Sequence, residues 1–175
     1  YLDGKVTNMN KKFEDVKYSA HSEQEGIVAN DDYIALNWTF KDCVVVLEAN
    51  DFKRIAIDTP MIKGHKGAVT DLAFSPFKNN LLSTSCEDNC LRLFMLDDVK
   101  NMKSHITEAD DVVEMAHTAK MTSLKWHNCV ENLIATAGRD GYVKLWDAYD
   151  TNEALYSLTD LGGNVNHMDW SQDGK

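Results

Sequence analysis

The sequence has little that would suit a membrane-spanning, secreted or nucleic-acid-binding protein. No apolar run approaches the ~20 residues needed to cross a bilayer, and the polar start at residues 1–10 lacks the apolar centre of a signal peptide. Only 18 basic residues stand against 28 acidic ones, for a formal net charge of -10. We therefore expect no nucleic-acid partner and no general attraction to anionic membrane, because both depend on clustered Lys and Arg.

Several other signals are also missing. The chain lacks an initiator methionine, so we expect it to begin inside a longer protein. No Gly-rich phosphate loop and no metal-ligand spacing is present, so no cofactor is expected. The four cysteines have no CxxC spacing and indicate reduced, packed side chains rather than a disulfide framework. They are Cys43, Cys86, Cys90 and Cys129.

What the chain does contain is an internal repeat of 30 residues that aligns without gaps. Residues 65–94 read HKGAVTDLAFSPFKNNLLSTSCEDNCLRLF, and residues 117–146 read HTAKMTSLKWHNCVENLIATAGRDGYVKLW. In both copies a histidine precedes an aspartate by 23 positions and an aromatic residue by 29. A third copy begins with Val165, Met168 and Trp170, which predict its first strand.

Each full copy predicts three short strands joined by turns. In the first copy the strands are expected at 69–74, 81–85 and 90–94, and in the second at the same spacing. Asp88-Asn89 and Asp140-Gly141 lie before the last strand, and Asp-Gly is a strong hairpin signal. Arg92 and Lys144 alternate with apolar neighbours in the third strand of each copy, which predicts a wetter face on that strand.

Short antiparallel strands with this H…D…W pattern resemble the WD40 repeat, which builds an all-β propeller of four-stranded blades. The resemblance implies seven blades in the full protein, about three to four of them here. It also implies a buried network in which the aspartate accepts from turn amides and the histidine ring, a threonine bridges, and the tryptophan N–H completes the chain. The matching residues are His65, Thr84 and Asp88 in the first copy, and His117, Thr136, Asp140 and Trp146 in the second.

Two consequences follow from this network. Phe94 stands where the second copy has Trp146 and has no N–H to donate, so we predict a shorter network and a less rigid blade in the first copy. Histidine, aspartate and threonine could also form a catalytic triad. Because the set is duplicated at fixed spacing, we interpret it as structural and expect no enzymatic activity.

The remaining segments fit the same plan. Residues 13–57 predict an earlier, degenerate blade, in which 43–47 is the clearest buried strand. The acidic connection between Leu96 and His117 predicts a surface loop and then, near 112–115, the outer strand of the next blade. The expected units are an N-terminal extension (1–12), a first blade (13–60), a second blade (61–98), the loop and outer strand (99–116), a third blade (117–150) and a truncated fourth (151–175).

Nearly the whole chain resembles the coronin family. The similar stretches are KFEDVKYS at 12–19, VANDDYIA at 28–35, GHKGAVTDLAFSPF at 64–77 and SCEDN at 85–89. The resemblance implies a cytoplasmic, non-catalytic scaffold of the actin cytoskeleton that binds F-actin and regulates the Arp2/3 complex and cofilin-driven turnover. It also implies homo-oligomers through a C-terminal coiled coil that lies outside this chain.

The resemblance also points to contact residues. A basic residue near the start of coronins matters for filament contact, and Lys17 is its match here. Where coronins often have a further arginine, this sequence has Ala20 and His21. Because actin filaments are acidic, Lys12, Lys63 and Lys66 are the other candidate contacts.

A second hypothesis stays open, namely a WD40 adaptor in another multiprotein complex, such as a ubiquitin ligase, a chromatin reader or a ciliary transport assembly. The sequence beyond this chain would discriminate the two. A heptad pattern there favours coronin, and an F-box or helical solenoid favours the adaptor.

Overall fold

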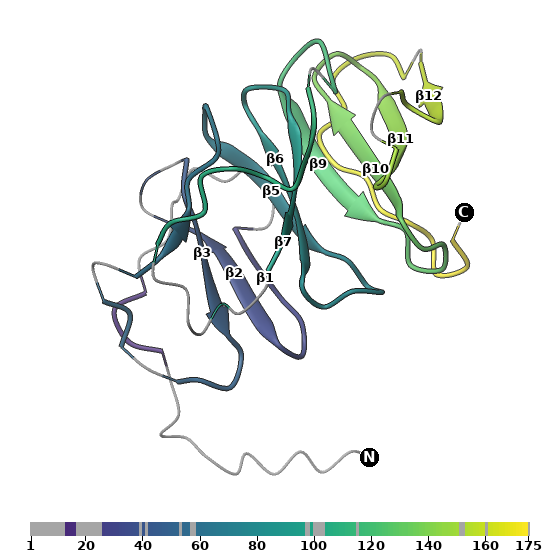
Figure 1. Ribbon diagram of the computed structural model, residues 1–175. Helices are drawn as coiled ribbons and strands as arrows, with labels where there is room; N and C mark the ends of the chain where they lie inside the picture. The colour runs from purple at the N-terminus through teal and green to yellow at the C-terminus, as the bar shows by residue number, and fades with distance from the viewer. Residues whose placement is uncertain are drawn as a thin grey trace.

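Three four-stranded antiparallel sheets make up the structure, a computed structural model of the 175-residue chain. They lie side by side as successive blades, in chain order (Figure 1). The predicted all-β WD40 architecture is confirmed. The residues that the structure describes are 13–16, 26–38, 40, 42–52, 54–56, 59–96, 99, 104–114, 116–150, 153–159 and 161–174. Within them, no helix has the length and apolar character that a membrane crossing requires.

Strands within each sheet follow one another in sequence, from one edge of the sheet to the other. The first sheet contains β1 (Ile27–Ala29), β2 (Tyr33–Asn37), β3 (Val44–Glu48) and β4 (Met61–Ile62). The second contains β5 (Val69–Phe74), β6 (Leu81–Cys86), β7 (Leu91–Met95) and β8 (Asp111–Val113). The third contains β9 (Met121–Trp126), β10 (Leu133–Gly138), β11 (Val143–Asp147) and β12 (Tyr156–Leu158).

The hairpin turns form where the sequence predicts them. Asn89 and Gly141, which follow the two repeated aspartates, both have positive φ, at 64° and 79°. This left-handed conformation is accessible to asparagine and glycine at low cost, and tight hairpin turns require it. Asp88 and Asp140 each accept a hydrogen bond from the amide two residues ahead, which holds the turn closed.

One predicted strand belongs to a different sheet. The segment near 112–115 was expected to form the outer strand of the next blade, and that expectation is wrong. β8 pairs with β7, with Leu91 opposite Val113, so it completes the second sheet. In the same way β4 completes the first sheet and β12 the third. The connection to each next repeat passes the free edge of the preceding third strand, whose unpaired backbone groups it satisfies. Each sheet therefore includes one strand (β4, β8 or β12) that lies beyond the blade boundary expected at residue 61, 99 or 151.

The third copy of the repeat forms no strand among the described residues 161–174. The predicted first strand at Val165, Met168 and Trp170 is therefore wrong, since a strand needs a paired neighbour and none pairs with this segment there. The segment still packs against the third sheet. Thr122 Oγ1 donates to the Val165 carbonyl at 2.5 Å, and the Val165 amide donates to the Gly138 carbonyl at 3.3 Å.

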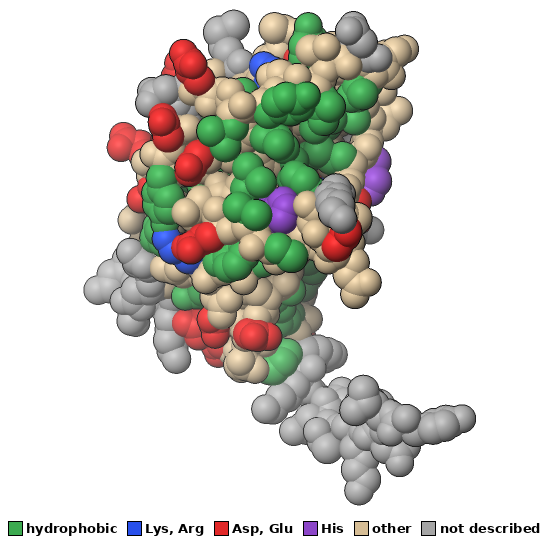
Figure 2. All heavy atoms as spheres, turned by 90° about the vertical axis from the view of Figure 1, so that its right-hand side faces the viewer, with side chains coloured by type: hydrophobic (Ala, Val, Ile, Leu, Met, Phe, Trp, Pro, Cys, Tyr) green, Lys and Arg blue, Asp and Glu red, His purple; other side chains and the backbone are tan. Residues whose placement is uncertain are grey.

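Two of the three buried hydrophobic clusters lie between sheets, and the third lies on the far face of the first sheet, around Val45 and Leu47. Leu82 and Phe94 pack toward the first sheet, whereas their neighbours Leu81 and Leu93 pack toward the third. This alternation follows from the two-residue period of a strand and buries both faces of the second sheet. The far flank of the third sheet instead presents a broad hydrophobic surface (Figure 2). Exposed residues of that sheet and the segment after it include Tyr142, Leu155, Tyr156, Leu158 and Leu161.

Polar links differ between the two sides of the third sheet. On the side facing the second sheet, Asp71 accepts from the Leu124 amide and Ser83 Oγ accepts from Trp126 Nε1, both at 2.8 Å. In the second copy of the repeat, the residues equivalent to these two acceptors are Ser123, in place of Asp71, and Ala135, in place of Ser83.

On the other side, Trp170 stands 44 residues after Trp126, at the equivalent point of the next copy. Within the described part of the chain, Ser123 Oγ and Trp170 Nε1 are both buried and have no hydrogen-bond partner. An unsatisfied buried polar group costs roughly 1–3 kcal/mol, so this side of the third sheet is held less firmly.

We predict that Ser83→Ala lowers the free energy of unfolding by about 1 kcal/mol, because Trp126 Nε1 would keep only the Ala73 carbonyl at 3.3 Å. The reciprocal change, Ala135→Ser, should raise stability and slow hydrogen exchange in residues 165–170, by supplying Trp170 with an acceptor. Urea denaturation and hydrogen exchange measure the two effects. A neutral Ser83→Ala would contradict this account of the link.

Candidate functional site

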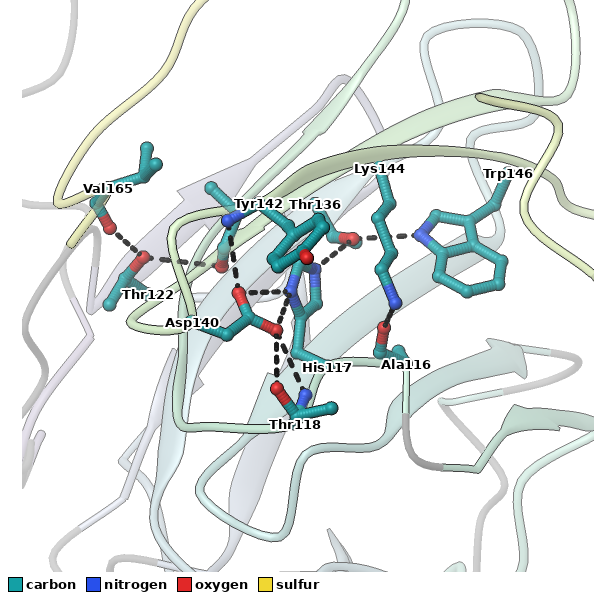
Figure 3. Close-up of polar contacts among 11 residues, drawn as sticks. Ala116, His117, Thr118, Thr122, Thr136, Asp140, Tyr142, Lys144, Trp146 and Val165 are labelled. Atoms are coloured by element: carbon teal, nitrogen blue, oxygen red, sulfur yellow. Dashed lines mark hydrogen bonds and ion pairs between the residues drawn. The ribbon is translucent and has the colours of Figure 1, made fainter. Parts of the chain in front are cut away.

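The second repeat contains a continuous hydrogen-bond network across the third sheet (Figure 3). Trp146 Nε1 donates to Thr136 Oγ1 at 2.8 Å, and Thr136 Oγ1 lies 2.8 Å from His117 Nε2. His117 Nδ1 lies 3.0 Å from both carboxylate oxygens of Asp140. Because the Asp140 carboxylate can only accept, Nδ1–H of His117 donates to it, and Nε2 of the neutral ring then accepts from the Thr136 hydroxyl, which itself accepts from the indole N–H. A single tautomer of His117 satisfies every member.

Asp140 connects the loop before β9 to the hairpin turn before β11. Its carboxylate also accepts from the amide of Thr118 at 2.9 Å and from that of Tyr142 at 3.2 Å. Burial by itself would raise the pKa of Asp140, but the hydrogen bonds from His117 and the Thr118 amide lower it below its ordinary value. Burial also lowers the pKa of His117, and Asp140 only partly offsets that effect.

The first repeat is connected differently. His65 Nε2 lies 2.8 Å from Thr84 Oγ1, as in the second copy, but Nδ1 donates to the Asp42 carbonyl at 3.1 Å. Asp88, expected to pair with His65, instead accepts from Arg92 at 3.1 and 2.6 Å. The network of the first copy therefore lacks both the aspartate and the tryptophan, and it extends to the turn between β2 and β3.

A glycine explains this divergence. Gly138 lies where an added Cβ would come within 2.7 Å of His117 Nδ1 and 2.8 Å of Asp140 Oδ1. The equivalent residue of the first copy, 52 positions earlier, is Cys86, which is fully buried. Because residue 86 carries a Cβ, the close approach of histidine and aspartate seen around Gly138 is not open to the first copy. Asp88 instead accepts from the Arg92 guanidinium.

Arg92 also corrects a sequence expectation. The predicted wetter face of its strand is not found at this position, because Arg92 is only 5% exposed. Its charge is neutralised by Asp88. Burial by itself would raise the pKa of Asp88, but the hydrogen bonds from Arg92 and the Cys90 amide lower it to about 2. Alternation of polar and apolar residues cannot distinguish a solvated arginine from one paired inside the fold.

The network side chains offer no surface to a substrate, since His117 and Thr136 are both fully buried. Their hydrogen bonds instead hold the loop, the second strand and the hairpin turn of one blade in place relative to each other. Among the described residues there is also no cluster of three or more metal-ligating side chains.

The candidate actin contacts are only partly placed. Lys63 and Lys66 are exposed, in the loop between β4 and β5. Lys12 and Lys17 lie outside the described residues. Sequence reasoning missed His105, which lies beside Lys63, with its Nε2 2.9 Å from Lys63 Nζ. No local pattern marks His105, because it comes from the connection 42 residues further along the chain.

We predict that Gly138→Ala destabilises the protein by about 2 kcal/mol, because the new methyl group would force His117 and Asp140 apart in a packed site. Trp146→Phe should cost about 1 kcal/mol by removing one buried hydrogen bond. Urea denaturation of the two variants and of an exposed control, Tyr149→Phe, measures both values. A Gly138→Ala variant as stable as the control would rule out the steric explanation.

Acid should destabilise the fold through its buried histidines. Burial, reinforced by the charge of Arg92, lowers the pKa of His65 to about 4, against about 6.5 in the unfolded chain. The unfolded state therefore binds more protons between these values, and stability falls as the pH drops through that window, by about 1.4 kcal/mol per pH unit for this residue. The shift of His117 acts in the same direction.

Unfolding free energies measured by urea at pH 7 and pH 5 test this. We expect a decrease of at least about 2 kcal/mol for the native sequence and a smaller one for His65→Asn, whose side chain does not titrate. An unchanged pH dependence in that variant would show that His65 does not carry the effect.

Comparisons with known proteins agree with this geometry. Residues 58–94 and 111–147 match the family described as WD domain, G-beta repeat. The crystal structure of the WD40 domain from Toxoplasma gondii coronin superposes with a TM-score of 0.83 at 26% sequence identity, covering 94% of this chain and 42% of that one.

Two of the relatives with similar sequences are also named coronin, and a third carries a different name. A coronin-like protein of Saccharomyces cerevisiae is 21% identical over 99% of this chain and 28% of its own length. Coronin-7 of Homo sapiens is 28% identical over 100% of this chain and 18% of its length. Protein transport protein SEC31 of Phaeosphaeria nodorum is 27% identical over 96% of this chain and 13% of its own length.

The chain thus spans less than a third of the length of these curated relatives. The three sheets, the two matched repeats and the superposition lead to the same identification. The chain is a partial WD40 propeller whose homologues include proteins named coronin.

Proposed function

We propose that this chain is part of an F-actin-binding scaffold of the coronin type. The observation that carries the proposal is its likeness to coronins over almost the whole chain, in sequence and in fold. The scaffold would organise actin filaments and their turnover without catalysis, in the cytoplasm at the actin cytoskeleton. Its further partners would be the Arp2/3 complex and cofilin, with homo-oligomers formed through a coiled coil elsewhere in the protein.

The physical basis of such binding is a rigid frame with a few basic contact points. The buried networks and shared cores hold the loops between strands in place, so little entropy is lost when a loop contacts a partner. On a chain of net charge -10, exposed lysines such as Lys63 and Lys66 are the places where an acidic filament can approach. Lys12 and Lys17 would contribute from the segment before the first sheet.

A second candidate is a WD40 subunit of another multiprotein assembly. The likeness to protein transport protein SEC31 over 96% of this chain favours it, since the identity there is close to that of Coronin-7. Both candidates use the same rigid frame. They differ in whether the partner is an actin filament.

Co-sedimentation of the full-length protein with F-actin across a salt series tests the proposal. We expect binding that weakens as salt rises, because the contacts are electrostatic and screened. Lys17→Asp should weaken it severalfold, whereas Lys78→Asp, on the β5–β6 loop, serves as a control of the same charge change. Unchanged binding by Lys17→Asp would remove that residue from the site. Absence of binding at low salt would contradict the actin assignment and favour the second candidate.

A further inference from the structure

The outer edge of the first sheet is covered by a segment from far along the chain. Ile106, in the connection between β7 and β8, forms a parallel bridge with Ile62 of β4. The Ile106 amide donates to the Met61 carbonyl at 3.0 Å, and the Lys63 amide donates to the Ile106 carbonyl at 2.7 Å. These bonds place His105 beside Lys63 on a fixed backbone.

One ring nitrogen of His105 is committed to this edge. The Met61 amide donates to His105 Nδ1 at 3.1 Å, so Nδ1 presents a lone pair. Met61 is 4% exposed, and losing this acceptor would leave its buried amide unsatisfied at a cost of roughly 1–3 kcal/mol. A neutral imidazole with an acceptor at Nδ1 carries its hydrogen at Nε2. His105 therefore presents an N–H donor on its outer side.

The N–H group at His105 Nε2 lies beside a second hydrogen-bond donor, the ammonium group of Lys63. His105 Nε2 lies 2.9 Å from Lys63 Nζ, and a lysine ammonium has three N–H groups and no lone pair to accept with. Both side chains are exposed, and no carboxylate pairs with Lys63 in the part of the chain that the structure describes. Two adjacent donors that cannot bond to each other are both satisfied when an anionic oxygen ligand binds across them.

We propose that Lys63 and His105 together bind the carboxylate of an acidic side chain on a partner protein. A carboxylate fits because its two oxygens can each accept one of the two hydrogen bonds. The proposal rests on the proposed function in taking the actin filament, an acidic surface, as the partner. It adds His105 as a contact residue and gives the chemistry by which Lys63 acts.

The matched variants are Lys63→Gln and His105→Asn. The asparagine side chain would be too short to reach the ligand, but its amide oxygen can still accept from the Met61 amide, so the covered edge is kept. In co-sedimentation with F-actin, each variant of the full-length protein should weaken binding about two- to fivefold, as for an exposed charged contact. The double variant should lose little more than either single one, because both donors serve one carboxylate.

A second readout does not depend on actin. The full-length protein with isotopically labelled histidines is titrated with a glutamate-rich peptide and, separately, with inorganic phosphate. We expect the His105 ring signal to shift with the peptide and to stop shifting in Lys63→Gln, while the His167 signal serves as control. A response to phosphate alone would overturn the protein carboxylate as ligand, and no response to either would overturn the site. Failure of the wild-type protein to bind actin, with the peptide response intact, would reject the proposed function only.

Discussion

Everything in this molecule depends on sheets that must bury both of their faces. In β6, Leu81 packs toward the third sheet while its neighbour Leu82 packs toward the first. The second sheet buries both apolar faces because a sheet lies on each side of it, so this blade depends on its neighbours for stability. The interior of the array is therefore rigid, and variation is left to the loops and the outer edges.

Within that constraint the two repeats use their polar residues in different ways. In the second copy, His117, Thr136, Asp140 and Trp146 form one network within the third sheet. In the first copy, Cys86 stands where the second has a glycine, and Arg92 binds the aspartate. His65 donates to the carbonyl of Asp42, in the turn between β2 and β3 of the first sheet. One copy stiffens a single blade, and the other links two blades. Both satisfy their buried groups, which is the condition a buried polar network must meet.

The same logic separates the frame from its contact surface. The long connection after β7 covers the edge of β4 and completes the second sheet through β8. Pairing blocks the free edge, and the backbone bonds also set His105 against Lys63. An acidic chain with few exposed cations can direct a partner to such a point, because surrounding negative charge disfavours other approaches by an acidic surface.

The sequence by itself determined the repeat, its strands and turns, the WD40 architecture and the members of the second network. Those features depend on local spacing, on the two-residue period of strands and on turn residues such as Asn89 and Gly141, all visible along one stretch of chain. Only the tertiary structure decided which sheet receives β8, which partner Asp88 takes, and that His105 meets Lys63. These outcomes depend on groups that are distant in sequence competing for the same space or the same hydrogen bond, and no local pattern encodes the result of that competition.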